Sequence, residues 1–252
     1  MTKIISIHSY RGGTGKSNIT ANLVTSIALQ GKQVVVIDCD IQSPGIHNIF
    51  DLNESDIDKT LNDYFWGRAT IYETIYDVSQ ETGIKNEGKI LLIPASVNAD
   101  EIARILSEGY NVNLIHQGIQ ELIKNLNLDY VFIDTHPGLS KEVFLSIAIS
   151  HIFLVVLRPD RQDFQGTAII IDLAKQLMIP KMMLLVNKVV NSINFNDLKI
   201  QIENTYGIPI VGMFPVSEEM FLLGSNGIFC QEYAYHNWTK NLRIVAEEIL
   251  KA

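Results

Sequence analysis

One stretch constrains the fold of this chain more than any other: residues 10–17, which read Tyr-Arg-Gly-Gly-Thr-Gly-Lys-Ser. The alternating, β-branched run 3–9 before it is typical of a strand, and residues 18–30 after it place apolar side chains at helical spacing. A strand, a glycine-rich turn and a helix in this order are the context of a phosphate-binding loop. Glycines let backbone N–H groups close on an anion, and the start of the helix adds unpaired N–H groups and a dipole. The stretch therefore predicts a phosphate site rather than a plain glycine turn.

Two side chains of this loop have predicted roles. Lys16 is expected to reach the β- and γ-phosphates of a nucleotide, and Ser17 to give its hydroxyl to Mg²⁺. The other residues here that we expect to contact the nucleotide are Gly12, Gly13, Thr14, Gly15 and Asn18.

Composition and charge narrow the class of protein. The chain has 252 residues, enough for one large α/β domain or two small ones, and 47% of them are hydrophobic and 19% charged, which does not suggest disorder. No internal repeat or linker is evident, so we expect a single domain that comprises residues 1–252. The net charge of −8 argues against a wholly basic nucleic-acid binder. Residues 1–140 carry a net −7 and residues 141–252 only −1, so a local basic patch fits the C-terminal half better. No targeting segment or membrane span is evident, and we expect a cytoplasmic protein.

Strand signals alternate with helix signals along the rest of the chain. We expect strands at 33–37, 89–94, 130–134, 151–157, 181–186 and 208–214, and helices at 98–107, 112–126, 164–177 and 238–250. This alternation predicts an α/β fold with a doubly wound, mostly parallel sheet and helices on both faces. Residues 47–88 are the least readable and suggest one or two short helices, whose aromatic side chains we interpret as core rather than as a partner surface.

Carboxylates lie at the ends of two apolar strands. Asp38 and Asp40 follow the run 33–37, and Asp134 closes the run 130–134. Open α/β sheets bind ligands at the carboxyl ends of their strands, so these carboxylates are candidates for a metal or a reacting water. A helix N-cap or an Asx turn is the other interpretation of Asp38 or Asp40. Asp134 has the place of a Walker B aspartate, which holds a water on Mg²⁺.

The glycine loop resembles the deviant phosphate loop of the ParA/MinD family of positioning ATPases, written K-G-G-x-G-K-[S/T]. Arg11 stands where that family has its signature lysine, which crosses into the partner subunit and touches the nucleotide there. The chain is in this respect similar to members without that lysine, such as the ATPase that spaces carboxysomes. The resemblance implies a P-loop ATPase with ATP or ADP and Mg²⁺ as cofactors. It also implies a homodimer that forms on ATP, with slow hydrolysis stimulated by an adaptor protein.

The same resemblance implies roles at the metal and at the base. Asp40 matches the switch I residue that orients Mg²⁺ or the attacking water. Asp38 matches a residue that contacts a metal-bound water without contacting the metal ion itself. Asn187 matches the asparagine that hydrogen-bonds adenine, and Pro215 begins the loop that contacts the purine. His136 lies in a segment similar to switch II, and we interpret it as structural rather than as a base. The predicted catalytic residues are Arg11, Lys16, Asp38 and Asp40, and the predicted metal site comprises Ser17, Asp40 and Asp134.

Arg11 has two interpretations. Its planar, permanently charged fork suits phosphate oxygens across a dimer, like the arginine fingers of other phosphate-loop enzymes. Alternatively, it points to solvent or pairs with a local acid, and another cation makes the contact in the partner subunit.

Several functions remain open under this resemblance. MinD-type proteins grip membrane with a basic amphipathic helix at the C-terminus, whereas residues 241–252 hold two cations and two acids. ParA-type proteins hold DNA non-specifically with basic side chains. We favour DNA, with a plasmid, a chromosomal locus or a protein organelle as cargo, and keep a membrane-associated septum or polar positioning ATPase as the alternative. A metabolic or metal-cluster-carrier enzyme of the same superfamily is a further alternative. An iron–sulfur carrier would need a C-x-x-C motif near the C-terminus, where Cys230 stands alone.

Overall fold

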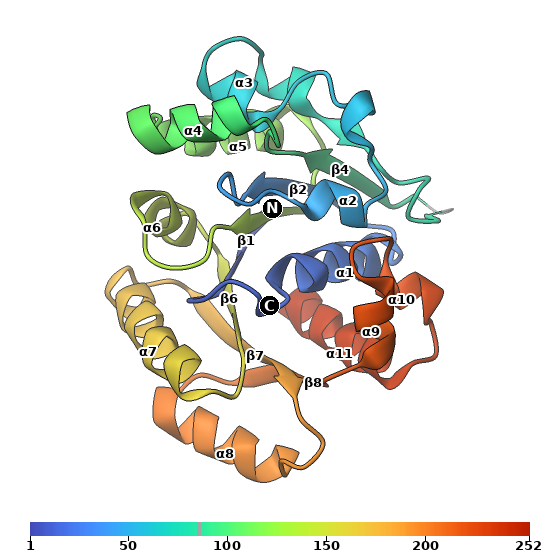
Figure 1. Ribbon diagram of the computed structural model, residues 1–252, viewed down its shortest axis with the longest axis vertical. Helices are drawn as coiled ribbons and strands as arrows, with labels where there is room; N and C mark the ends of the chain where they lie inside the picture. The colour runs from blue at the N-terminus through green and yellow to red at the C-terminus, as the bar shows by residue number, and fades with distance from the viewer. Residues whose placement is uncertain (85–86) are drawn as a thin grey trace.

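The computed structural model describes residues 1–84 and 87–252. The protein is built on one β-sheet (Figure 1). The strand order is β3-β4-β2-β5-β1-β6-β7-β8, and every neighbouring pair is parallel except β3 with β4. The strands are β1 (Lys3–His8), β2 (Gln33–Cys39), β3 (Tyr76–Asp77), β4 (Lys89–Ile93), β5 (Tyr130–Thr135), β6 (Ile152–Leu157), β7 (Lys181–Val189) and β8 (Ile210–Pro215). The predicted fold class, a doubly wound and mostly parallel sheet, is confirmed.

Helices cover both faces of this sheet (Figure 1). The α-helices are α1 (Lys16–Ala28), α2 (Ile46–Ile49), α3 (Leu61–Phe65), α4 (Ala99–Glu108), α5 (Asn113–Asn125), α6 (Lys141–Ala148), α7 (Arg161–Gln176), α8 (Phe195–Tyr206), α9 (Glu218–Leu223), α10 (Phe229–Glu232) and α11 (Asn237–Lys251). Two 3₁₀ turns, η1 (Glu54–Asp56) and η2 (Ile71–Thr74), lie between α2 and β3. In the described part of the chain, no helix is both long and apolar enough to cross a membrane.

The core follows from the two-residue period of the strands. In β1, Ile5 and Ile7 enter the core that contains α1 and α11, while Ile4 enters the core on the other face with α5. Since both faces are buried, the central strands read as continuous apolar runs, the pattern of a parallel sheet. The α6, α7 and α8 helices enclose a third apolar cluster beside β6 and β7.

Several predicted boundaries were wrong. The first helix begins at Lys16 rather than at residue 18, and α7 begins at Arg161 rather than at 164. Asp160 caps α7, because its side chain accepts hydrogen bonds from the backbone N–H groups of Gln162 and Asp163. The strand β2 continues to Cys39, so Asp38 lies inside it, and β7 continues to residue 189.

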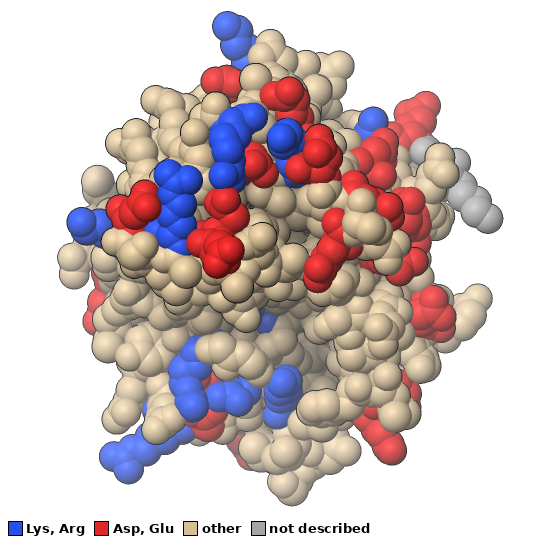
Figure 2. Space-filling model, turned by 45° about the horizontal axis from the view of Figure 1, so that its top comes forward, with Lys and Arg blue, Asp and Glu red and all other residues tan. Residues whose placement is uncertain are grey.

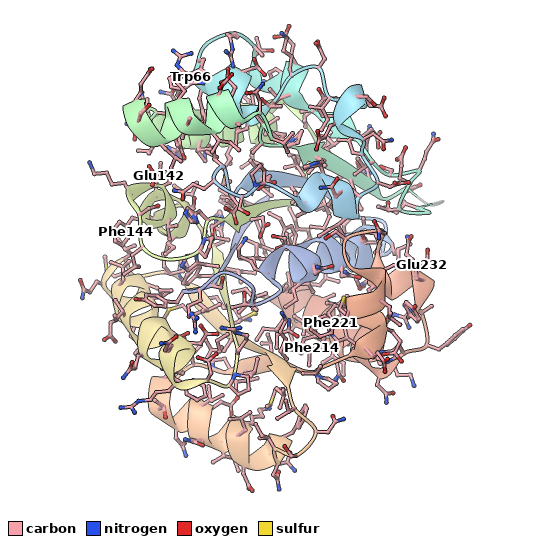
Figure 3. All side chains as sticks on the ribbon, in the orientation of Figure 1. Trp66, Glu142, Phe144, Phe214, Phe221 and Glu232 are labelled. Carbon is pink, nitrogen blue, oxygen red and sulfur yellow. The ribbon has the colours of Figure 1, made fainter. Side chains whose placement is uncertain are left out.

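The stretch 47–88 is only partly as predicted. It contains short helical segments and also the antiparallel strand β3, which the sequence did not predict. Phe65 is buried, and Tyr64 and Trp66 (the latter labelled in Figure 3) pack partly buried against the same core, which confirms the core interpretation of these three aromatic residues. The interpretation was wrong for Tyr72, which is 37% exposed. Residues 85 and 86 of this stretch lie outside the described residues.

Candidate nucleotide site

The glycine-rich loop connects β1 to α1 at the carboxyl edge of the sheet. Gly13 and Gly15 have φ angles of 75° and 88°, a left-handed conformation that glycine adopts without strain. Gly15 is the N-cap of α1, so Lys16 opens the helix and Ser17 follows it. A Cβ on Gly15 would lie 2.6 Å from the Nδ2 atom of Asn187, which adds a steric reason for glycine here.

Behind this loop lies a buried charged cluster. The Nζ atom of Lys16 is 2.8 Å from Oδ1 of Asp134 and 3.8 Å from Oδ2 of Asp40. The Oγ1 atom of Thr20 is 3.1 Å from the same Oδ1 of Asp134. Burial, the largest single influence on Lys16, lowers its pKa, but the carboxylates of Asp134 and Asp40 outweigh it and raise the pKa above its ordinary value. Lys16 is therefore held as an ammonium ion.

Two carboxylate oxygens of this cluster are unpartnered. Oδ2 of Asp134 and Oδ1 of Asp40 are buried and have no hydrogen-bond partner among the described residues. Among residues 1–84 and 87–252, no group of three or more His, Cys, Asp or Glu side chains could hold a metal ion by itself. Mg²⁺ is commonly held by one or two carboxylates together with substrate phosphates and waters. The two unpartnered oxygens fit a Mg²⁺ ion that is bound together with a nucleotide.

Asp38 and Asp40 have different environments. Asp38 is fully buried and accepts hydrogen bonds from the backbone N–H groups of Asp40 and Gly45, at 3.0 and 3.3 Å, which corresponds to the Asx-turn interpretation. Burial and then the charge of Asp134 raise the pKa of Asp38 to about 7. Asp40 instead lies between Lys16 and His136, whose Nδ1 atom is 3.8 Å from Oδ1 of Asp40. Asp38 thus shapes the loop, while Asp40 faces the charged cluster.

A cavity of about 210 Å³ lies beside Gly15 and the start of α1. It brings together Asn187 and Pro215, which the resemblance assigned to base recognition. Asn187 donates a hydrogen bond from Nδ2 to the carbonyl oxygen of Thr14 at 2.8 Å. The cavity is lined further by Gly15, Asn18, Ile19, Lys188, Val216, Ser217, Met220, Phe221, Gly224, Ser225 and Trp238. This combination of apolar side chains with a few amides suits a flat, partly polar ring such as a nucleobase.

Arg11 lies outside the charged cluster. Its Nη1 atom is 3.7 Å from Oδ1 of Asp160, and both side chains are 41% exposed. Arg158 contacts the same carboxylate at 3.2 Å, so the two arginines share one acid beside the loop. Figure 2 shows Lys and Arg side chains gathered below a hollow on one face of the molecule. Within this chain, Arg11 therefore has the local pairing that was one of its two interpretations.

Sequence reasoning missed three contributors to the site. Thr20 lies one turn after Lys16 in α1, so the helical spacing could have indicated it. Lys188 follows Asn187 directly and also contacts the glycine loop. His8 ends β1 and hydrogen-bonds through Nδ1 to the hydroxyl of Thr135 at 2.7 Å; burial and then the charge of Lys16 lower its pKa to about 3, which keeps the imidazole neutral.

Residues 5–228 match the model of the CobQ/CobB/MinD/ParA nucleotide-binding domain. The chain belongs to this family. The matched range contains the glycine loop, both aspartate motifs and Asn187. The predicted resemblance to ParA/MinD ATPases is thereby confirmed.

Similar family members occur in archaea and bacteria. An uncharacterised ATP-binding protein of Methanocaldococcus jannaschii is 30% identical over 217 residues, which cover 85% of this chain and 75% of that protein. The septum site-determining protein MinD of Synechocystis is 25% identical over 232 residues, covering 90% of this chain and 81% of that protein.

Solved structures show the same family fold. MinD of Pyrococcus horikoshii in complex with Mg-ADP has a TM-score of 0.81 at 19% identity and covers 99% of this chain and 96% of that one. MinD in the MinC:MinD complex of Aquifex aeolicus also has a TM-score of 0.81 at 19% identity, and the match covers 100% of this chain and 96% of that one. A ParA family ATPase of Chlorobium tepidum has a TM-score of 0.78 at 16% identity, covering 98% of both chains. The backbone is therefore similar to both MinD and ParA proteins.

Proposed function

We propose that this chain is a Mg²⁺-dependent ATPase of the ParA/MinD type that acts as one domain over 1–252, dimerises on ATP and positions an intracellular cargo. The observation that carries the proposal is the buried cluster of Lys16, Asp134 and Asp40 behind the glycine loop, with two unpartnered carboxylate oxygens. A structural ion pair alone would not explain buried oxygens without partners, since leaving such atoms unpaired costs free energy. A nucleotide with its metal ion supplies the missing partners.

Each residue of the cluster has a role in this proposal. Lys16 would contact the β- and γ-phosphates in place of Asp134, and Asp134 would help to hold the metal ion. Asp40 would orient the attacking water or the ion, and the hydroxyl of Ser17 would help to hold the ion. The ion, when bound, neutralises charge that develops on the phosphates. Asp38 acts indirectly, because it fixes the backbone from Asp40 to Gly45.

Arg11 is the proposed contact to the nucleotide of the partner subunit. Its pair with Asp160 is half-exposed, and such surface pairs contribute only about 0–1 kcal/mol. The pair is therefore a weak competitor to a bidentate contact with a phosphate across a dimer. An adaptor protein would regulate the turnover of that dimer, as the family resemblance implies.

We propose non-specific DNA as the matrix that the ATP-bound dimer holds, which would place the protein on the nucleoid. Arg11 of the glycine loop and Arg158 both contact Asp160, and the exposed Arg161 follows Asp160 directly, so these arginines could reach phosphates of a duplex. The apolar face of α11 includes Trp238 and Leu242, which are buried where the helix packs on α1 and β8, so this face is not available to a bilayer. These two features favour DNA over membrane.

Fluorescence anisotropy of a labelled duplex of arbitrary sequence tests this proposal. We expect binding with ATP and Mg²⁺, little binding with ADP, and at least about tenfold weaker binding when salt rises from about 50 to about 200 mM, because phosphate contacts release counterions. The variant Arg161→Glu should weaken binding, whereas Lys240→Glu, a charge reversal at an exposed position on α11, is the matched control. ATP-dependent binding to anionic vesicles with none to DNA would instead establish the membrane alternative.

A further inference from the structure

Lys188 has an unusual backbone conformation next to the nucleotide cavity. Its φ angle is 57°, in the left-handed region that side chains other than glycine rarely adopt. The pairing of β7 with β8 shifts register between Val186 and Val189, so Asn187 and Lys188 form a bulge. Successive side chains of a regular strand point to opposite faces, whereas a bulge redirects them. Both side chains of this bulge reach the glycine loop.

The two side chains contact consecutive carbonyl groups of that loop. Lys188 donates a hydrogen bond from Nζ to the carbonyl oxygen of Gly13 at 2.8 Å, and Asn187 donates one from Nδ2 to that of Thr14, also at 2.8 Å. In a trans peptide unit the C=O group and the next N–H group point in opposite directions. Holding these two carbonyls therefore turns the N–H groups of Thr14 and Gly15 away from β7. Successive N–H groups fixed in this way form an anion-binding nest.

The surroundings of Lys188 support a positioning role. The side chain is half-buried and has no ion pair with a carboxylate in the described part of the chain. Its Nζ atom lies 5.6 Å from the centre of the Phe221 ring, a residue of α9 that is labelled in Figure 3. Burial and then the charge of Arg158 lower the pKa of Lys188. The carbonyl oxygen of Gly13 is the hydrogen-bond acceptor of this half-buried charge.

We propose that the Asn187–Lys188 bulge is a clamp that holds the glycine loop in its phosphate-binding conformation, with Lys188 as a positioning residue. The left-handed backbone at Lys188 is strain that the fold maintains because it brings two neighbouring side chains to one loop. This inference rests on the proposed nucleotide site and adds a residue to it. The clamp acts on the loop, so it operates both with and without a nucleotide.

Release of a fluorescent ADP analogue, followed by stopped flow, tests the clamp together with thermal unfolding. Lys188→Met should release the analogue at least about tenfold faster, because the loop loses one of its two fixed carbonyls. Lys188→Arg keeps a donor and should remain near the parent rate. Lys240→Met, at an exposed position on α11, is the control and should not change it.

Lys188→Gly distinguishes a clamp from a merely structural residue. Glycine adopts the φ angle of 57° without strain, so the unfolding temperature should stay the same or rise while release becomes faster. A structural role predicts that stability and release change together. Parent-like release in both Lys188→Gly and Lys188→Met would overturn the clamp.

A second measurement keeps the clamp separate from the proposed function. Backbone ¹⁵N relaxation of the nucleotide-free protein should show lower order parameters for the amides of Thr14 and Gly15 in Lys188→Gly than in the parent. If the parent chain binds no nucleotide but these amides become mobile in the variant, the proposed function fails and the clamp stands. Unchanged order parameters would contradict the clamp whatever the chain binds.

Discussion

The two ends of the candidate nucleotide site are built in opposite ways. At the phosphate end, Lys16 and Asp134 are 5% and 1% exposed and pair with each other. At the base end, Phe221 is 65% exposed and Val216 41%, and the cavity is mostly apolar. The phosphate end thus concentrates charge in a few buried groups, whereas the base end spreads weak contacts over a wide surface.

This difference indicates which end of the site contributes more to nucleotide affinity. In the proposed complex a phosphate group replaces the Lys16–Asp134 contact, and a charge-assisted contact in a buried site contributes more than an exposed apolar one. Loss of one buried charged group also leaves its partners unpaired, which adds to the effect. Substitutions at the phosphate end should therefore have large effects on all nucleotides, and those at the base end small ones.

The largest effect is expected at Lys16. Lys16→Ala should weaken ATP binding by about 100-fold or more, because the variant loses the cation for the β- and γ-phosphates and leaves Asp134 buried without it. Isothermal titration calorimetry with ATP and Mg²⁺ measures this. Lys32→Ala, which removes a half-exposed lysine 3.9 Å from Asp129, is the control. An unchanged ATP affinity of Lys16→Ala would contradict the assignment of the nucleotide site to this loop.

Substitution of Arg11 should impair the steps that depend on ATP without changing the affinity for ADP. Arg11→Ala is expected to lose ATP-driven dimerisation and hydrolysis while it keeps its ADP affinity, since the guanidinium lies outside the charged cluster of its own chain. Arg11→Lys should retain part of both, because the charge remains but the bidentate geometry does not. Turnover assays and calorimetry with ADP give the two readouts. A variant Arg11→Ala that dimerises and turns over at the parent rate would assign the trans contact to another cation.

The smallest effect is expected at Phe221. Phe221→Ala should weaken ADP binding by only about two- to fivefold, because the ring is mostly exposed and loses little burial. Phe144→Ala on α6, labelled in Figure 3, removes a surface phenylalanine outside the cavity and should leave the affinity unchanged. A loss at Phe221 as large as at Lys16 would mean that the base end dominates binding.

Sequence reasoning succeeded where local pattern decides the structure. The glycine loop between β1 and α1 and the seven parallel strands have signals in consecutive residues, and the structure confirms them. It failed where a tertiary contact decides. β3 has two residues and exists through its pairing with β4, and the hydroxyl of Tyr76 bonds to the backbone of Lys59. Such a segment carries no periodic pattern to detect.

The candidate site shows the same division. The motif residues lie at strand ends that a parallel sheet brings to one edge, so their neighbourhood follows from the sequence. The positive φ angle of Lys188 and the contact between Thr20 and Asp134 depend on a bulge and on the approach of α1 to β5. The helices α6 and α8 were also missed, although Ser140 and Asn194 cap them with side-chain hydrogen bonds that a search for N-cap residues would have suggested.

The central claim is that ATP, held at the phosphate end, switches the chain into a dimer. Asp40→Ala should bind ATP but hydrolyse it slowly, because Asp40 is the proposed orienting group of the attacking water, and the ATP-bound dimer should therefore accumulate. Light scattering of this variant with ATP and Mg²⁺ should give twice the 28.3 kDa mass of one chain, and the monomer mass with ADP. The same mass with ATP as with ADP, at concentrations where calorimetry shows that ATP is bound, would contradict the account.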